Sequence, residues 1–178
     1  MSENAPTILI VGGVAGGASA AARARRMNED ARIIIFERDS YVSFANCGLP
    51  YYLGGEFTDR DALLVAKPAL FKRRVDIEVR TRHEVIAIDR AAKLLMVQDL
   101  DAGTSYRMSY DKLILAPGAD PVEPPIPGRN AAGVFTLRNL EDTDRIAEAM
   151  PGARRAVVVG GGYVGLETAE QFRRRGLE

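Results

Sequence analysis

Short apolar runs, glycine-rich turns and an Ala/Arg-rich stretch follow one another at the start of the chain. A β-branched and leucine run at Thr7–Val11 precedes a glycine-rich turn, and the Ala/Arg-rich stretch through Met27 then favours a helix. The next apolar run, Arg32–Phe36, ends at Glu37. This order of strand, tight turn, helix and strand predicts a βαβ unit whose two strands are buried and parallel.

The middle of the chain has a less regular pattern. Residues 40–55 are mixed, and we expect a loop that passes into a short helix near Cys47, with Pro50 in its first turn. A helix is expected over residues 63–75. Short strands are expected near Ile77–Arg80, Glu84–Asp89 and Leu94–Asp99, with a further strand pair within Tyr106–Leu115.

The last part of the chain repeats the pattern of its beginning. A proline-rich stretch at residues 119–133 predicts a linker, and a helix is expected near Asn139–Met150. The apolar run Ala156–Val159 then leads into Gly160–Gly165, so that a strand, a glycine turn and a helix occur a second time. We therefore predict an α/β chain with one nucleotide-binding unit at residues 1–118, a linker and helix at 119–153, and the start of a second unit at 154–178.

Both glycine turns have the composition of a dinucleotide-binding turn. A pyrophosphate binds to backbone N–H groups at a helix N-terminus, where a Cβ atom in the wrong place blocks its approach. The first turn has Gly12 and Gly17 in the outer positions but Val14 in the middle one, and Glu37 follows where it can accept hydrogen bonds from a ribose. A purely structural glycine connection is the alternative. The second turn matches G-x-G-x-x-G at Gly160, Gly162 and Gly165.

Composition narrows the classes of function. The chain has 178 residues, of which 47% are apolar and 27% charged, as is typical of a soluble globular protein. Its 24 basic and 24 acidic side chains cancel, so no overall field favours nucleic acid or an anionic membrane. The apolar run Ile8–Ala22 lacks the basic start of a signal peptide and is too short to span a bilayer. A single cysteine argues against an extracellular disulfide framework, and we expect a cytoplasmic protein.

A third motif lies between the two units. The segment Tyr110–Gly118 ends in Ala-Pro-Gly and resembles a flavin motif of the pyridine nucleotide-disulfide oxidoreductase superfamily, with Pro117 in place of the usual threonine. Two glycine turns separated by such a motif are similar to the order in that family. The resemblance implies an FAD/NAD(P)-binding Rossmann-like two-dinucleotide fold in which the first unit binds FAD and the second binds NAD(P)H. It also implies a longer chain that forms homodimers, so that this sequence ends early in the second domain.

Cys47 is the residue on which the expected chemistry depends. In general, a lone cysteine is more often an inert buried side chain than a nucleophile. Cys47, however, lies in an irregular polar loop before an expected helix N-terminus, where the helix dipole and free N–H groups stabilise a thiolate. Members of the superfamily with a protein dithiol carry C-x4-C, but the two required positions hold Val42 and Tyr52. A mechanism with two protein thiols is therefore excluded.

The surroundings of Cys47 resemble the branch of the superfamily with one redox-active cysteine, and most closely its coenzyme A-disulfide reductases. The resemblance covers Ser43–Tyr51 and the Gly-Gly-Val-Ala-Gly-Gly order of the first turn. It implies hydride transfer from NAD(P)H to FAD and then electron flow to a mixed disulfide between Cys47 and coenzyme A (CoA). By the same resemblance, the residues that contact CoA are Ser19, Arg23, Arg26, Ser43 and Asn46, with Arg73 and Arg74 as weaker candidates. The alternative is that the helix arginines, Arg25 included, form an ordinary solvated face.

The resemblance also implies cofactor contacts in both units. For FAD these are Gly12, Val14, Ala15, Gly16, Glu37, Arg38, Val85, Ala116 and Gly118. For NAD(P)H they are Gly160, Gly162, Tyr163 and Gly165. Tyr163 would cover the nicotinamide pocket, and ordinary aromatic packing is its alternative role. The only histidine, His83, is assigned a structural part, and no metal site is expected.

Alternative functions stay open at this point. Cys47 could cycle through a sulfenic acid, as in NADH oxidases and peroxidases of the same superfamily. A related variant reduces a polysulfide or persulfide with CoA as the carrier. In a different class, a non-catalytic nucleotide sensor or scaffold would tolerate Cys47→Ser. The choice between NADH and NADPH is also open, because the acidic ribose ligand of the second unit would follow Glu178.

Overall fold

A four-stranded parallel sheet forms the centre of the first of two compact units. The computed structural model describes residues 5–178, which group into one unit up to Phe44 and over Leu64–Gly118, and another of Ala45–Leu63 with Ala119–Glu178. All three strand pairings in the sheet are parallel, which confirms the predicted βαβ unit. The strand order is β3-β2-β1-β7, with β1 at Thr7–Val11, β2 at Arg32–Glu37, β3 at Glu78–Thr81 and β7 at Lys112–Leu115.

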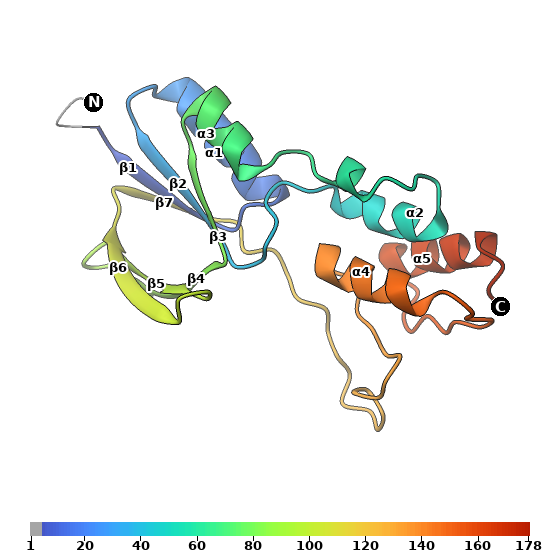
Figure 1. Cartoon of the computed structure of the whole chain (residues 1–178). Coiled ribbons are helices and arrows are strands. Elements are labelled where there is room, and N and C mark those ends of the chain that lie inside the picture. The colour runs from blue at the N-terminus through green and yellow to red at the C-terminus, as the bar shows by residue number, and fades with distance from the viewer. Residues whose placement is uncertain (1–4) are drawn as a thin grey trace. The chain divides into compact units, whose positions relative to one another are not determined.

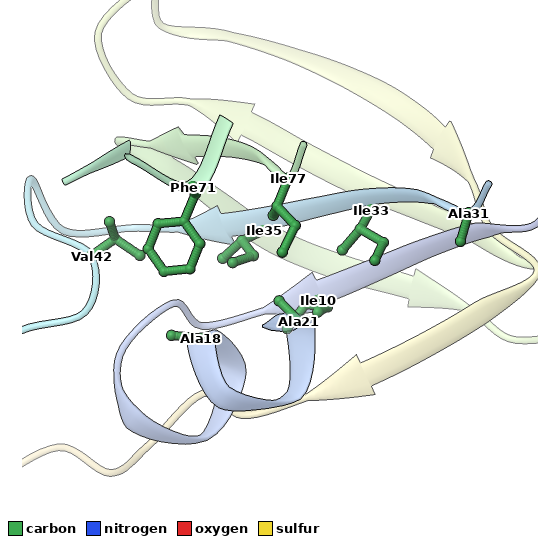
Figure 2. Close-up of a cluster of buried hydrophobic side chains, with 9 residues drawn as sticks. All are labelled: Ile10, Ala18, Ala21, Ala31, Ile33, Ile35, Val42, Phe71 and Ile77. Atoms are coloured by element: carbon green, nitrogen blue, oxygen red, sulfur yellow. The ribbon is translucent and has the colours of Figure 1, made fainter. Parts of the chain in front are cut away.

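Two helices, α1 at Ala15–Met27 and α3 at Pro68–Val75, cover one face of this sheet (Figure 1). Ala18 and Ala21 present only methyl groups to the strands, so α1 can approach them closely. Phe71 of α3 joins the same buried cluster (Figure 2). An apolar cluster between helices and strands is what a parallel sheet needs on each of its faces.

A three-stranded antiparallel sheet packs on the opposite face. Its strands are β4 at His83–Asp89, β5 at Leu94–Asp99 and β6 at Thr104–Ser109, in the order β4-β5-β6. Leu95 and Val97 of β5 lie in one buried cluster with Leu9 and Phe36, whose side chains alternate with those facing the helices. The strands predicted between residues 77 and 115 are formed, but the two within Tyr106–Leu115 do not pair with each other, because β6 joins the antiparallel sheet and β7 joins the parallel one.

All regular elements of the second unit are helical. Its elements are the 3₁₀ turns η1 at Asn46–Gly48 and η2 at Arg60–Leu63, and the helices α2 at Leu49–Gly54, α4 at Leu140–Ala149 and α5 at Tyr163–Arg174. Asn139 caps α4, because its side-chain oxygen accepts a hydrogen bond from the Asp142 N–H at 2.9 Å. Arg60 joins η2 to α4 through two 2.6 Å hydrogen bonds to the Asp144 carboxylate. The expected division into domains at residues 118 and 153 stays a prediction.

Two predicted elements are wrong. The helix expected over residues 63–75 is broken, because Lys67 has the extended backbone (φ −93°, ψ 155°) that a following proline favours. The strand expected at Ala156–Val159 is not formed, since no strand of the described chain pairs with this run and Val157 and Val159 are 88% and 79% exposed. An extended segment without a neighbouring strand lacks the ladder hydrogen bonds that stabilise a sheet.

Candidate nucleotide and thiol sites

The first glycine turn is held by contacts that leave no room for side chains at two positions. Gly12 follows β1 with φ +88°, and a Cβ atom there would overlap the Ala116 carbonyl, with the carbonyl carbon at 2.7 Å. A Cβ at Gly17 would overlap the Gly12 carbonyl in the same way. Glycine is therefore required at both positions, because the end of β7 and the start of α1 lie directly against the turn.

The N-terminal end of α1 is open to a ligand. Ala15 and Gly16 in its first turn are exposed, the first turn contains no acidic residue, and no side chain caps the helix. The first N–H groups of a helix lack intrahelical partners and carry the positive end of its dipole. Val14 has a negative φ of −86°, so the position of the middle glycine does not require the left-handed conformation that favours glycine. This geometry fits a phosphate group.

Glu37 is buried and bonded to the same turn. Its side chain lies at the end of β2 in a residue that is 6% exposed. One carboxylate oxygen accepts the Gly13 N–H at 2.7 Å, and the other accepts the Asp39 N–H at 3.0 Å. Burial raises the pKa of the Glu37 carboxyl, and these two N–H donors oppose the shift. The carboxylate therefore braces the turn, and its contact with a ribose stays a prediction.

We expect the buried carboxyl of Glu37 to give the stability of the chain a measurable pH dependence. A pKa raised above 4.5 means that the folded state binds a proton more tightly than the unfolded state. The stabilisation is present below pH 4.5 and is lost as the pH rises through the folded-state pKa. The free energy of unfolding of the wild type, measured in urea from pH 4.5 to 7.5, should fall relative to that of Glu37→Gln. Parallel profiles would contradict this, and exposed Glu29→Gln is the control.

The carboxyl ends of β1, β2 and β7 bring three of the expected FAD residues together. Gly12, Glu37 and Ala116 follow or end these strands, and the Ala116 N–H donates to the Val11 carbonyl at 2.8 Å. Ligands of open α/β sheets bind at this edge. Arg38 lies beside the Asp39 carboxylate at 3.9 Å, and the exposed Gly118 has φ +73°.

The antiparallel sheet holds the remaining residues assigned to the first unit. Val85 of β4 pairs with Val97 and packs half-buried against the cluster beneath the sheet. His83 Nδ1 lies 2.8 Å from the Thr81 carbonyl, and its ring meets that of Tyr106 edge-on. These contacts agree with the structural part expected for His83. Adenine binding by the Val85 backbone stays a prediction.

The arginines of α1 differ in what they contact. Arg25 donates to the carbonyls of Val75 and Asp76, both at 2.9 Å, and so ties α1 to the end of α3. Ser19, Arg23 and Arg26 are exposed and follow one another at the spacing of one helix face. Arg73 and Arg74 are exposed on α3. Arg25 is therefore structural, while the other arginines present their charges to solvent.

Ser43 and Asn46 lie shortly before Cys47 in the sequence, Ser43 in the first unit and Asn46 in the second. The Ser43 N–H donates to the Gly13 carbonyl at 2.9 Å, and the Ser43 carbonyl accepts the N–H groups of Val65 and Ala66. These bonds hold Ser43 at φ +51°, a conformation that costs a residue with a Cβ about 1 kcal/mol. Asn46 is half-buried in η1. Direct contact of either with CoA stays a prediction.

Cys47 is exposed in the 3₁₀ turn that leads into α2. The turn is closed by the Gly48 N–H, which donates to the Ala45 carbonyl at 2.9 Å, and by the Leu49 N–H, which donates to the Asn46 carbonyl. The short helix predicted near Cys47, with Pro50 in its first turn, is confirmed. The thiol is the only one in the sequence, so the chain cannot form an internal disulfide.

The second glycine turn repeats a close contact of the first. A Cβ at Gly165 would overlap the Gly160 carbonyl, just as one at Gly17 would overlap that of Gly12. Gly160 has φ +114°, and Gly162 caps α5 with open space around it. Tyr163 follows at 87% exposure, so it does not pack against its own helix. The same contact between glycine turn and helix therefore occurs twice in the chain, although no strand of the described residues leads into the second turn.

Comparison with known proteins shows to which family this chain belongs. The family model described as "Pyridine nucleotide-disulphide oxidoreductase" matches residues 6–178. This chain belongs to that family. The coenzyme A disulfide reductase of Staphylococcus haemolyticus is 44% identical over 178 residues, which are 96% of this chain and 39% of that protein. The chain therefore spans about two fifths of the length of this curated relative.

Two solved structures of the family are also similar. Reduced CoADR-RHD of Bacillus anthracis is 46% identical with a TM-score of 0.94, and the match covers 98% of this chain and 32% of that one. An NAD-dependent persulfide reductase from A. fulgidus is 40% identical with a TM-score of 0.92, covering 97% and 32%. The predicted α/β FAD/NAD(P)-binding fold is thereby confirmed.

The described residues hold neither a candidate membrane-spanning helix nor a candidate metal site. Within residues 5–178, no helix has the length and apolar content that a bilayer crossing requires. No three His, Cys, Asp or Glu side chains of the same residues gather around a possible metal position.

The sequence did not predict the contribution of Gly13, whose N–H donates to Glu37, because a glycine pattern does not show which N–H groups are already bonded.

Proposed function

We propose that the protein is an FAD-dependent NAD(P)H oxidoreductase that reduces CoA disulfide, or a related CoA-linked persulfide or polysulfide, through Cys47. One observation carries the proposal: the exposed thiol of Cys47 stands in a turn at the start of a helix, and the sequence holds no second cysteine. A disulfide substrate would then form a mixed disulfide with Cys47, and two electrons would cleave that disulfide without the help of another thiol from these 178 residues. The 44% identity to a coenzyme A disulfide reductase supports CoA as the thiol.

The proposed chemistry balances around Cys47. Its thiolate attacks one sulfur of CoA disulfide, the sulfur–sulfur bond breaks, and one CoA thiolate leaves as the Cys47–CoA mixed disulfide forms. Two electrons then cleave the mixed disulfide, which restores the Cys47 thiolate and releases the second CoA thiolate. FAD, when bound, would supply those two electrons after taking a hydride from NAD(P)H. One NAD(P)H and one proton are consumed for each two thiols produced.

The residues of the first glycine turn fit the FAD pyrophosphate. The exposed N–H end of α1 at Ala15 and Gly16 would hold the phosphates, with Val14 beside them. Glu37 and Arg38 would bind the adenosine ribose, Val85 the adenine, and Ala116 and Gly118 would approach the cofactor from the end of β7. In the second turn, Gly160, Gly162 and Gly165 would take the NAD(P)H pyrophosphate, and the exposed Tyr163 would cover the nicotinamide.

We expect the exposed arginines of α1 to select CoA among disulfides. Arg23 and Arg26 would bind the phosphates of CoA, with Ser19, Ser43 and Asn46 as further contacts. Replacing both arginines with alanine should raise KM for CoA disulfide by about tenfold or more, since hydrogen bonds to charged groups contribute about 1.5–3 kcal/mol. Steady-state kinetics with hydroxyethyl disulfide, which has no phosphate, should show no such change. Exposed Arg107→Ala is the control, and equal effects on both disulfides would contradict CoA binding here.

A panel of acceptors tests the reaction itself. Consumption of NADH and NADPH should be measured for the full gene product with CoA disulfide, CoA persulfide, polysulfide, peroxide and oxygen. We expect kcat/KM to be highest for CoA disulfide or for the persulfide. Strong turnover with peroxide alone would contradict the proposal and favour a sulfenic acid cycle at Cys47.

A persulfide acceptor is the second candidate, because one similar structure is a persulfide reductase at 40% identity. The same Cys47 chemistry would apply, with a CoA persulfide in place of the disulfide. Release of sulfide rather than of a second CoA thiol distinguishes the two reactions. A homodimer and a cytoplasmic location complete the proposal, and sedimentation of the full gene product tests the first of these.

A further inference from the structure

The second glycine-turn helix packs against the helix that follows Cys47. In α5, Gln171 is 1% exposed, and its Oε1 atom is buried with no hydrogen-bond partner among the described residues. A Cβ atom at Gly54 of α2 would overlap that oxygen and lie 2.7 Å from Gln171 Cδ. The two helices therefore meet at a position where only a glycine fits.

The contact at Gly54 explains the unpartnered oxygen. Because a Cβ at Gly54 would overlap Oε1, the α-hydrogen that glycine carries there points at the oxygen. Cα–H···O contacts of this kind recur between closely packed helices. The Gln171 oxygen thus stays buried without a conventional donor, and its position depends on the position of Gly54.

The last residue of α5, Arg174, and the C-cap residue Arg175 add two polar contacts at the end of α2. Arg175 Nε donates to the Leu53 carbonyl at 3.0 Å, and Arg174 forms an ion pair with Glu56. Gly55 ends α2 in the left-handed conformation at φ +79°, and a Cβ there would lie 3.0 Å from Arg175 Cζ. Arg175 therefore takes up one of the carbonyls that a helix leaves without partners at its C-terminus.

The contacts that fix the end of α2 also fix the turn that carries Cys47. The helix has six residues, about 9 Å in length, and η1 continues into it through the Leu49 N–H bond to Asn46. Gly48 is also packed closely, since a Cβ there would lie 2.8 Å from Leu63 Cδ2. A shift at Gly54 would therefore be transmitted to the Cys47 turn as the motion of one short rigid piece.

We propose that Gln171 and Arg175 are positioning residues for Cys47. They act from the C-terminal end of the helix whose first residues follow the second glycine turn. Their importance for turnover rests on the proposed function of Cys47, while their effect on the turn does not. The effect on the Cys47 turn and the effect on turnover can therefore be tested separately.

Hydrogen exchange of the full gene product tests the positioning directly. In Arg175→Ala and in Gly54→Ala, we expect the Gly48 and Leu49 amides to exchange about tenfold faster, with no change in the amides of β1 and β2. Arg175→Lys, which keeps a donor, should recover part of the protection. The matched control is Arg173→Ala, because this exposed arginine lies in the last turn of α5 and its side chain forms no hydrogen bond or ion pair with the described residues.

Two results would overturn the positioning role. One is unchanged exchange at Gly48 and Leu49 in both variants. The other is equally faster exchange throughout β1 and β2, which would show a purely global loss of stability. In the activity assay, Arg175→Ala should lower kcat for the disulfide and leave KM for NAD(P)H unchanged. A wild-type protein without disulfide turnover would contradict the proposed function but leave the exchange result intact.

Discussion

Replacing Cys47 with serine is expected to lower kcat for the reduction of CoA disulfide by at least about a thousandfold, because the nucleophile is lost. A serine hydroxyl cannot form the mixed disulfide and cannot accept electrons from a reduced cofactor. The fold should be unaffected, since Cys47 is exposed and surface substitutions change stability by about 0.5 kcal/mol at most. Steady-state oxidation of NAD(P)H measures the loss. Mass spectrometry should detect a CoA adduct on the wild type and none on the variant.

The comparison also separates the classes of function. Ser40→Ala changes an exposed residue of the same loop that is assigned no contact, and it should keep full activity. Binding of FAD to Cys47→Ser should equal that of the wild type. If the variant retained disulfide reduction, the thiol mechanism would be wrong. If neither protein reduced a disulfide and both bound FAD equally, a non-catalytic nucleotide sensor would be the better account.

Replacing Gly12 with alanine is expected to destabilise the chain by roughly 3–5 kcal/mol, the combined cost of backbone strain and of a steric overlap. The residue has φ +88°, and its new Cβ would overlap the Ala116 carbonyl. We also expect FAD affinity to fall by at least about tenfold, because a loss of 1.4 kcal/mol at the turn suffices for that. Unfolding in urea and quenching of flavin fluorescence are the two measurements.

Gly103→Ala is the matched control for that substitution. Gly103 also has a positive φ, of +67°, but a Cβ there would meet nothing within 4 Å. Its cost should be limited to strain of about 1–2 kcal/mol, and flavin binding should not change. Equal destabilisation by the two variants would show that the contact with Ala116 does not matter and that the turn can relax around a side chain.

The elements that local pattern predicted well are those with short-range causes. The bounds predicted for Leu94–Asp99 agree with β5, and the helix through Met27 ends where α1 ends. Alternating or continuous apolar runs bounded by turn residues are sufficient for such elements. Ala156–Val159 has the same kind of run but no neighbouring strand within the described chain. A strand is a property of a pairing, so a run of suitable residues is not enough.

Residue order alone was sufficient for the thiol count, the glycine turns and the acidic residue at the end of β2, because each is a matter of which residue stands at a short spacing. It did not reveal that Glu37 is already bonded to Gly13, or that Arg25 is bonded to the end of α3. Nor did it connect Gln171 with Gly54, which lies far away along the chain. Such contacts join residues brought together only by folding. Only the tertiary structure therefore decided the burial and the hydrogen-bond partners of these side chains.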